Sequence, residues 1–385
     1  MKHLKSIFQK ALSYWPIAAI IFITFSLSFL NYQPNTWLTG WDNIHSEFNF
    51  PLHFKRYLSI WQQYRGLGLL AGMAHSADLL RTLFAYLLSQ VFPLNSIRYL
   101  LTFITLTLGP LGVYFLASKT ILDKLDPQAK KLAAFFAALA YLLNLNTIQI
   151  FYLPFETFTY FYAFLPWLLY SSLNYLNQPS RKSFILLTLT LLASTPSFYV
   201  QTLFLVFILS LIPFLIHHLA TSLSFSTIKH LSLLTLTIII TQAYWLLPNS
   251  YFALSSADKL PTAQQNQIST REIAARNQEF GQISDLALLK GFNFQYTDLN
   301  ISENKFELMM QPWIEHLSHP VIMSIGYAIF ILAIIGLIYS LVKKLYTAIP
   351  LTILALISIF FLINLNPPFI SLYQSFQDQF PLLNQ

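Results

Sequence analysis

The sequence predicts an all-α polytopic membrane protein. Of its 385 residues, 55% are hydrophobic and only 10% are charged, and its mean hydropathy is +0.55. The apolar residues fall in runs of about 20, the length at which an α-helix crosses the roughly 30 Å hydrocarbon core of a bilayer. Because backbone groups inside lipid must be satisfied within the protein, we expect these runs to be helices rather than strands.

We predict nine membrane spans in a single membrane domain over 1–385. The first span follows Lys2, Lys5 and Lys10 and has no small-residue cleavage site after it, so it is expected to be an uncleaved signal anchor. The segment 79–93 is ambiguous, because it fits either a further span or a helix lying in the membrane interface. The nine predicted spans are 14–32, 97–117, 132–150, 157–176, 183–197, 198–217, 228–248, 320–341 and 346–364.

The charges outside the spans predict the topology. With the N-terminus in the cytoplasm, every short cytoplasmic loop carries Lys or Arg, as the positive-inside rule requires. All but Asp123 and Asp126 of the 15 acidic residues then lie on the outer side, together with the two long loops 33–96 and 249–319. We therefore expect a multi-pass protein of the plasma (inner) membrane whose functional loops are extracytoplasmic.

The composition argues against several classes of function. The chain has no Cys, which excludes a thiolate metal site and a cysteine nucleophile. No Asp, Glu, Lys or Arg lies in the middle of a predicted span and no internal repeat is visible, which argues against an ion-coupled transporter. The net charge of +7 is explained by the topology, so no nucleic-acid partner is expected.

The first external loop is predicted to contain two helices that lie in the membrane interface. Apolar residues recur at i, i+3, i+4 and i+7 over 54–64, which gives that segment one apolar face. Lys55 and Arg56 lie on its other faces, either as interfacial anchors or as ligands of lipid phosphates. A second helix is expected to begin at Asp78.

Asp42 and Glu47 follow directly after the first span. A carboxylate at the outer membrane surface can act as a general base on an acceptor hydroxyl or bind a divalent cation. Cations nearby can stabilise the negative charge of a departing phosphate. Together these features meet the requirements of glycosyl transfer from a lipid-phosphate sugar. The plainer alternative is that both acids are solvated residues of a polar loop.

Several short motifs accompany this acidic pair. They are Gly40-Trp41-Asp42, Asn49-Phe50-Pro51, Arg56, Trp61, Gly66-Leu67-Gly68, Gly109-Pro110-Leu111-Gly112 with Tyr114, and the segment 284–292. In these motifs the chain resembles the GT-C superfamily of integral-membrane glycosyltransferases. The likeness is closest to the N-terminal membrane region of bacterial alpha-arabinofuranosyltransferases and related cell-wall-glycosylating proteins. Members of that group usually continue with further spans or a soluble domain, so we expect this chain to be truncated at its C-terminus.

The resemblance implies transfer of a sugar from a polyprenyl-phosphate donor to an extracytoplasmic glycan or lipid acceptor, with Asp42 as the catalytic base. Glu47 is the second catalytic candidate. Glu156 would match an acidic position that some family members carry in a later external loop, and with Glu47 it is the candidate ligand of an optional divalent cation (Mg, Mn or Ca). Alternatively, Glu156 only stabilises the N-terminus of the helix that follows it. The candidate ligands of the donor phosphate are Arg56, Arg65, Arg271 and Arg276.

Two other functions fit the sequence. In a polysaccharide ligase or polymerase, Arg271 or Arg276 of the second long loop would carry the reaction and Asp42 would matter little. A non-catalytic membrane scaffold would place neither Asp42 nor Glu47 beside a cavity.

Overall fold

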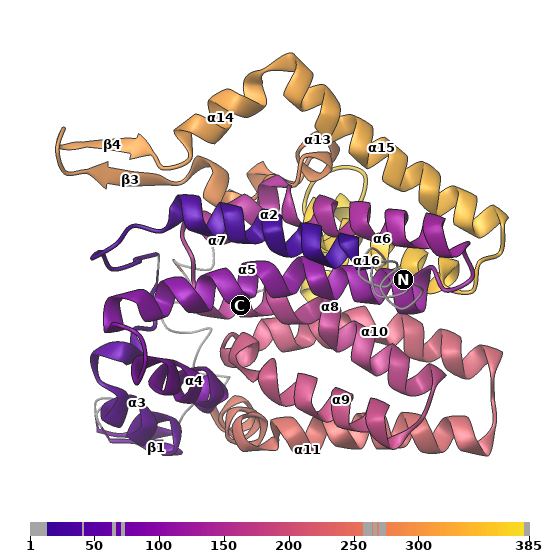
Figure 1. Cartoon of the computed structure of the whole chain (residues 1–385), viewed down its shortest axis with the longest axis horizontal. Coiled ribbons are helices and arrows are strands. Elements are labelled where there is room, and N and C mark those ends of the chain that lie inside the picture. Colours follow the sequence, from indigo (N-terminus) through magenta and orange to yellow (C-terminus); the bar gives the residue numbers. More distant parts are fainter. Residues whose placement is uncertain are drawn as a thin grey trace, which may run out of the picture. The chain divides into compact units, whose positions relative to one another are not determined.

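The computed structural model describes residues 14–40, 42–63, 67–70, 74–256, 264, 268 and 275–380. The chain is mostly helical and divides into two compact units (Figure 1). The first unit comprises 1–143 and 150–254, and the second comprises 144–149 and 255–385.

The first unit is a helical bundle built around two long helices, α5 and α8, which pack along each other. On its other sides α5 contacts α2, α4 and α6, while α8 contacts α9, α10 and the short helix η4. The elements of this unit are α2 (Trp15–Asn31), η1 (Ser46–Phe48), α3 (Phe50–Tyr57), β1 (Trp61–Gln62), β2 (Leu69–Leu70), η2 (His75–Asp78), α4 (Leu79–Ser89), α5 (Leu94–Leu116), η3 (Ala117–Ile121), α6 (Pro127–Leu142), the end of α7 (Leu145–Tyr152), α8 (Glu156–Asn177), α9 (Arg181–Ala193), η4 (Thr195–Tyr199), α10 (Gln201–Thr221) and most of α11 (Phe225–Ser256).

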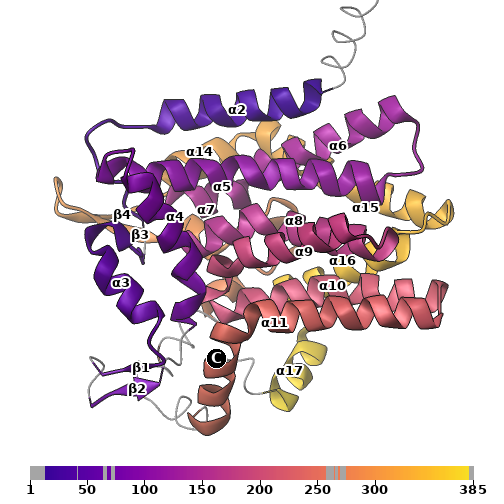
Figure 2. The same ribbon diagram turned by 60° about the horizontal axis from the view of Figure 1, so that its bottom comes forward.

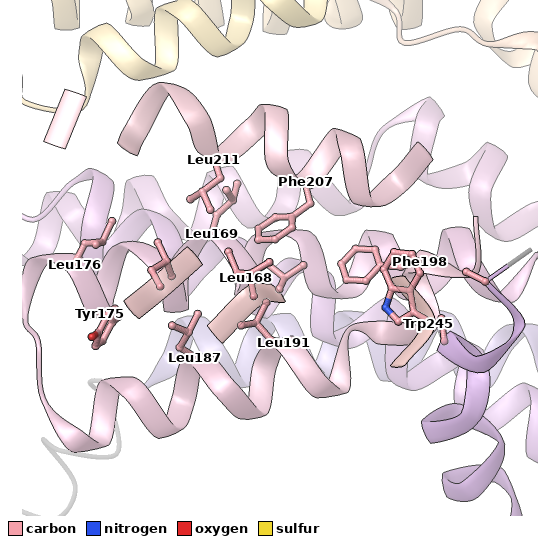
Figure 3. Close-up of a cluster of buried hydrophobic side chains, with 14 residues drawn as sticks. Leu168, Leu169, Tyr175, Leu176, Leu187, Leu191, Phe198, Phe207, Leu211 and Trp245 are labelled. Carbon is pink, nitrogen blue, oxygen red and sulfur yellow. The ribbon is translucent and has the colours of Figure 1, made fainter. Parts of the chain in front are cut away.

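The main core of this unit lies between α8, α9, α10 and α11 (Figure 3). Leu168 of α8, Leu191 of α9, Phe207 of α10 and Trp245 of α11 are almost completely buried there. Lipid tails are about as apolar as leucine, so in a membrane this cluster stabilises the bundle by close packing rather than by transfer from water. The bundle therefore forms a rigid support for the loops at its ends.

At one end of α5 lie α3, α4 and the hairpin β1–β2, which belong to the long segment 33–96 that is predicted to be external (Figure 2). α3 begins where Asn49 accepts a hydrogen bond from the amide of Leu52 at 3.1 Å. The helix predicted over 54–64 is wrong in its second half, because α3 ends at Tyr57 and the chain enters β1 at Trp61.

Tyr57 supplies the physical reason for this early end. Its carbonyl oxygen accepts a hydrogen bond from the hydroxyl of Ser76 at 2.7 Å, so it is not used to continue the helix. Its ring is 2% exposed, and its hydroxyl donates to Asp78 at 3.0 Å.

The expected second helix does begin directly after Asp78, as α4. Its 11 residues are too few to cross a bilayer, so 79–93 is not a span.

The second unit contains the start of α7 and the elements that follow residue 255. Its core packs Leu145, Phe294 and Met310 together. Gln149 joins α7 to the loop after α13, since its amide donates to the carbonyl of Leu289 at 2.9 Å and accepts from the amide of Gly291 at 3.0 Å. The elements are α13 (Ile283–Ala287), η6 (Phe292–Gln295), the antiparallel hairpin β3 (Thr297–Asn300) with β4 (Lys305–Leu308), α14 (Gln311–Ser318), α15 (Pro320–Val342), α16 (Ala348–Ile363) and α17 (Ile370–Gln379).

Each of the nine predicted spans contains a helix. Within the described residues, four helices are long and apolar enough to cross a membrane, and there are five if the bent pair α6 and α7 forms one span. The apolar helices α2 and α16 are shorter, with 17 and 16 residues. The chain is thus a multi-pass helical membrane protein. The four helices cover Leu94–Ile121, Gln201–Thr221, Phe225–Ser255 and Pro320–Val342.

Candidate functional site

A buried ion pair joins the start of α5 to the start of α8. The Nε atom of Arg98 lies 2.8 Å from Oε1 of Glu156, and the two side chains are 3% and 7% exposed. Arg98 also donates to the carbonyl oxygens of Leu38 and Pro154, both at 2.6 Å. One guanidinium therefore joins the segment between α2 and α5 to the turn that precedes α8.

The peptide groups of Ile44 are held from both sides. Its amide donates to Oε2 of Glu156 at 3.1 Å, and its carbonyl accepts from Arg81 at 3.1 Å. With Leu38 bound by Arg98, the segment 38–44 is fixed at both ends. Gly40 lies close to Pro154, whose carbonyl oxygen accepts from Arg98. A Cβ atom at Gly40 would be 2.2 Å from that oxygen.

Arg81 and Asp78 form a second buried pair. The guanidinium donates to both carboxylate oxygens of Asp78 at 2.7 Å, and both residues are at most 2% exposed. Burial alone would lower the pKa of Arg81, but the charge of Asp78 and these two hydrogen bonds raise it well above its usual value. Burial, and then the charge of Asp78, also raise the pKa of Tyr57. Arg81 thus stays charged and Tyr57 stays neutral at any physiological pH.

Asp42 lies between the two fixed ends of this segment, and its side chain is exposed. Its φ angle is +44°, in the left-handed region that residues other than glycine seldom adopt. The neighbouring turn is closed by Asn43, whose side chain accepts from the amide of Gly40 at 2.7 Å and donates to its carbonyl at 2.8 Å. Backbone strain of this kind persists only where the surrounding structure imposes it.

Glu47 lies inside the cluster rather than at the surface. It is 5% exposed, and its carboxylate lies 2.8 Å from Nδ1 of His45. Nη1 of Arg98 lies 3.5 Å from Nε2 of the same ring. Arg98 can only donate, so Nε2 is the acceptor and Nδ1 carries the proton that is donated to Glu47. Glu47 therefore belongs to the network that fixes the loop, and its catalytic role stays a prediction.

The optional divalent cation at Glu47 and Glu156 stays a prediction. Both oxygens of Glu156 are already engaged, one by the guanidinium of Arg98 and one by a backbone amide. A carboxylate neutralised in this way is a poor ligand for a hard cation. In the described parts of the chain, no three His, Asp or Glu side chains form a group that could hold a metal ion.

Of the four arginines predicted to bind the donor phosphate, the structure describes Arg56 and Arg276, which belong to different units. Arg56 of α3 is partly buried and hydrogen-bonded to Nε2 of His75. Arg276 belongs to the second unit, where its guanidinium lies 5.1 Å from the ring centroid of Tyr296. Arg65 and Arg271 lie outside the described residues.

Sequence reasoning missed the residues that build the site. Asp78 and Arg81 were expected on an interfacial helix, and Arg98 only as the opening of a span. Arg81 binds the carbonyl of Ile44 and Arg98 pairs with Glu156. These partners are far apart in the chain, so no local sequence pattern predicts the contacts. The one available signal is the cost of burying an unpaired charge, which makes any Arg or Asp near the end of a span a candidate for pairing.

Comparisons with protein-family models, with curated protein sequences and with solved structures give no match to this chain.

Proposed function

We propose that this protein is a GT-C-like integral-membrane glycosyltransferase. It would transfer a sugar from a polyprenyl-phosphate donor to an extracytoplasmic glycan or lipid acceptor, with Asp42 as the general base. The observation that carries the proposal is the exposed carboxylate of Asp42, whose backbone has a left-handed φ angle, on a segment whose two ends are held by buried Arg and Glu side chains. Preorganisation of this kind is what a catalytic acid or base requires.

In this mechanism the acceptor hydroxyl attacks the anomeric carbon of the donor sugar. The new bond forms between the acceptor oxygen and that carbon, and the hydroxyl proton passes to Asp42. The bond between the anomeric carbon and the phosphate oxygen breaks, and polyprenyl phosphate leaves with the electron pair. The configuration at the anomeric carbon is inverted. Arg56 is the described candidate that shares a unit with Asp42 and can stabilise the departing phosphate.

Asp42→Asn tests the proposal most directly, because it removes the base and keeps the size of the side chain. A positioned general base contributes about 10²–10⁴-fold to a rate, so transfer to the acceptor should fall by that factor with the thermal stability unchanged. Asp123→Asn is the matched control, since Asp123 is also exposed but is predicted to lie on the cytoplasmic side. An Asp42→Asn protein with full activity would refute Asp42 as the base.

The same transfer assay distinguishes the proposed glycosyltransferase from a polysaccharide ligase or polymerase. A ligase or polymerase would lose activity on Arg276→Ala or Arg271→Ala and keep it on Asp42→Asn. The transferase proposal expects the reverse order.

We also propose nine crossings of the plasma membrane with a cytoplasmic N-terminus. Because the chain has no Cys, single cysteines report topology without a background of native thiols. Asn43→Cys should react with a membrane-impermeant thiol reagent in intact cells, and Asp123→Cys only after permeabilisation. Labelling of Asp123→Cys in intact cells would overturn this topology.

A further inference from the structure

The first unit contains a cavity of about 290 Å³ beside α4 and α5 that places two hydrogen-bond donors in apolar surroundings. The donors belong to Arg81, through its guanidinium, and to Tyr160, through its hydroxyl, and the two residues are 2% and 7% exposed. Most of the remaining lining is apolar, including Phe84, Ile104 and Phe164.

These two polar groups are not fully satisfied by the protein. Arg81 uses Nε and one Nη for Asp78 and Ile44. Within the described residues, its other Nη and the hydroxyl of Tyr160 have no hydrogen-bond partner. A buried polar group without a partner is unfavourable by the free energy of its lost hydration, so a cavity with two of them favours a ligand that accepts hydrogen bonds.

The cavity lies next to an apolar groove, because two residues of α5 line both spaces. This groove has a volume of about 580 Å³ and lies between α2 and α5, which run side by side (Figure 2). Ile104 and Leu108 of α5 line both spaces. Ile104 and Phe84 are 38% and 42% exposed, so the cavity is open at the side of the bundle. A ligand can therefore enter from within the bilayer, and its apolar part can lie in the groove.

The charge of the cavity selects the chemistry of the acceptor. Asp78 neutralises Arg81 through two short hydrogen bonds, so the cavity offers donors without a net positive charge. An uncharged oxygen such as an ester carbonyl fits such a site better than a free phosphate, whose desolvation would not be compensated.

We infer that this cavity is a lateral binding site for a bilayer lipid, with an ester carbonyl accepting hydrogen bonds from Arg81 and Tyr160 and an acyl chain in the groove between α2 and α5. The inference does not depend on the transferase proposal, because it needs neither Asp42 nor a sugar.

The test uses the full chain in nanodiscs with a photoactivatable diacyl phosphatidylcholine as the probe. Tyr160→Phe removes only the hydroxyl and should lower crosslinking at low probe concentration by about 2–10-fold, the worth of one neutral hydrogen bond. Ile104→Trp adds a larger side chain at a position that lines both spaces, and it should lower crosslinking at least as much. Leu205→Trp is the matched control, since Leu205 is 48% exposed on α10 and lines neither space.

Competitors identify the group that is recognised. Unlabelled ester-linked phosphatidylcholine should displace the probe, whereas the ether-linked lipid, which lacks the carbonyls, and inorganic phosphate should not. Crosslinking of Tyr160→Phe and Ile104→Trp at the level of Leu205→Trp would overturn the site. Equal displacement by the ether-linked lipid, or displacement by inorganic phosphate, would overturn the ester assignment.

Discussion

The buried pair of Arg98 and Glu156 gives the sharpest prediction about stability. Glu156→Gln keeps the size of the side chain and one oxygen that can accept from the amide of Ile44, but it removes the charge that balances Arg98. A buried pair that loses one partner costs about 3–5 kcal/mol, because the other charge is left uncompensated. At 3% exposure, the guanidinium of Arg98 cannot turn to water. We therefore expect Glu156→Gln to lower the free energy of unfolding by that amount.

The double variant shows whether the charge is the cause. Arg98→Met alone should also destabilise strongly, since it leaves the Glu156 carboxylate buried and takes the donor from two carbonyl oxygens. The combination of Arg98→Met and Glu156→Gln removes both charges. Its loss should be smaller than the sum of the single losses by about 0.5–3 kcal/mol, the usual coupling of residues in contact.

Denaturant or thermal unfolding in detergent micelles, followed by the fluorescence of the 7 tryptophans, measures these differences. Lys305→Met is the control, because it breaks an ion pair between two exposed side chains, Lys305 at 54% and Glu303 at 56% exposure. This variant should leave the free energy of unfolding unchanged within the error of the measurement. Additive losses in the double variant, or a Glu156→Gln protein as stable as the wild type, would refute the reasoning.

Three further predictions concern the loops. Gly40→Ala places a methyl group against the carbonyl of Pro154 and should destabilise the protein by about 1–3 kcal/mol in the same unfolding assay; an unchanged midpoint would contradict the close approach. Gln149→Leu should speed hydrogen exchange of the Gly291 amide, since that amide loses its acceptor; unchanged exchange would contradict the bond. Burial lowers the pKa of His53 from its usual 6.5, so the unfolded chain takes up the proton first and stability should fall as the pH drops below about 6.5. His53→Gln should flatten that decline between pH 7 and pH 5, and an equally steep decline would show that another group titrates.

The positions of the helices followed from the sequence because hydropathy is a local property. The predicted span 320–341 corresponds to α15, and 198–217 corresponds to α10. Lipid exposure requires a continuous apolar run, and such a run is visible without any knowledge of its neighbours. The short helix α4 was located by the same local signals, with Asp78 directly before its first residue.

The end of α3 and the ion pairs did not follow from the sequence, because both depend on partners distant in the chain. The apolar spacing over 54–64 suits a helix, yet Tyr57 is drawn into the bundle by Asp78 and Ser76. Arg98 pairs with a carboxylate that lies on a different helix. Sequence periodicity reports which face of a segment is apolar, and it carries no information about which distant charge will balance a buried one.

The contacts of the segment 38–44 distinguish the proposed catalytic residue, Asp42, from the residues that position it. Arg81, Arg98 and Glu156 hold the ends of the segment 38–44 through the backbone of Leu38 and Ile44, and the side chain of Asp42 is not used to hold it. Loss of one of these three should lower stability and transfer together, because the fold and the geometry of the loop depend on the same bonds. Loss of the Asp42 carboxylate should lower transfer alone, because that side chain is exposed and holds nothing in place. If Asp42→Asn lowered stability as much as Glu156→Gln, Asp42 would be one more structural residue of the loop, and the transferase proposal would lose its base.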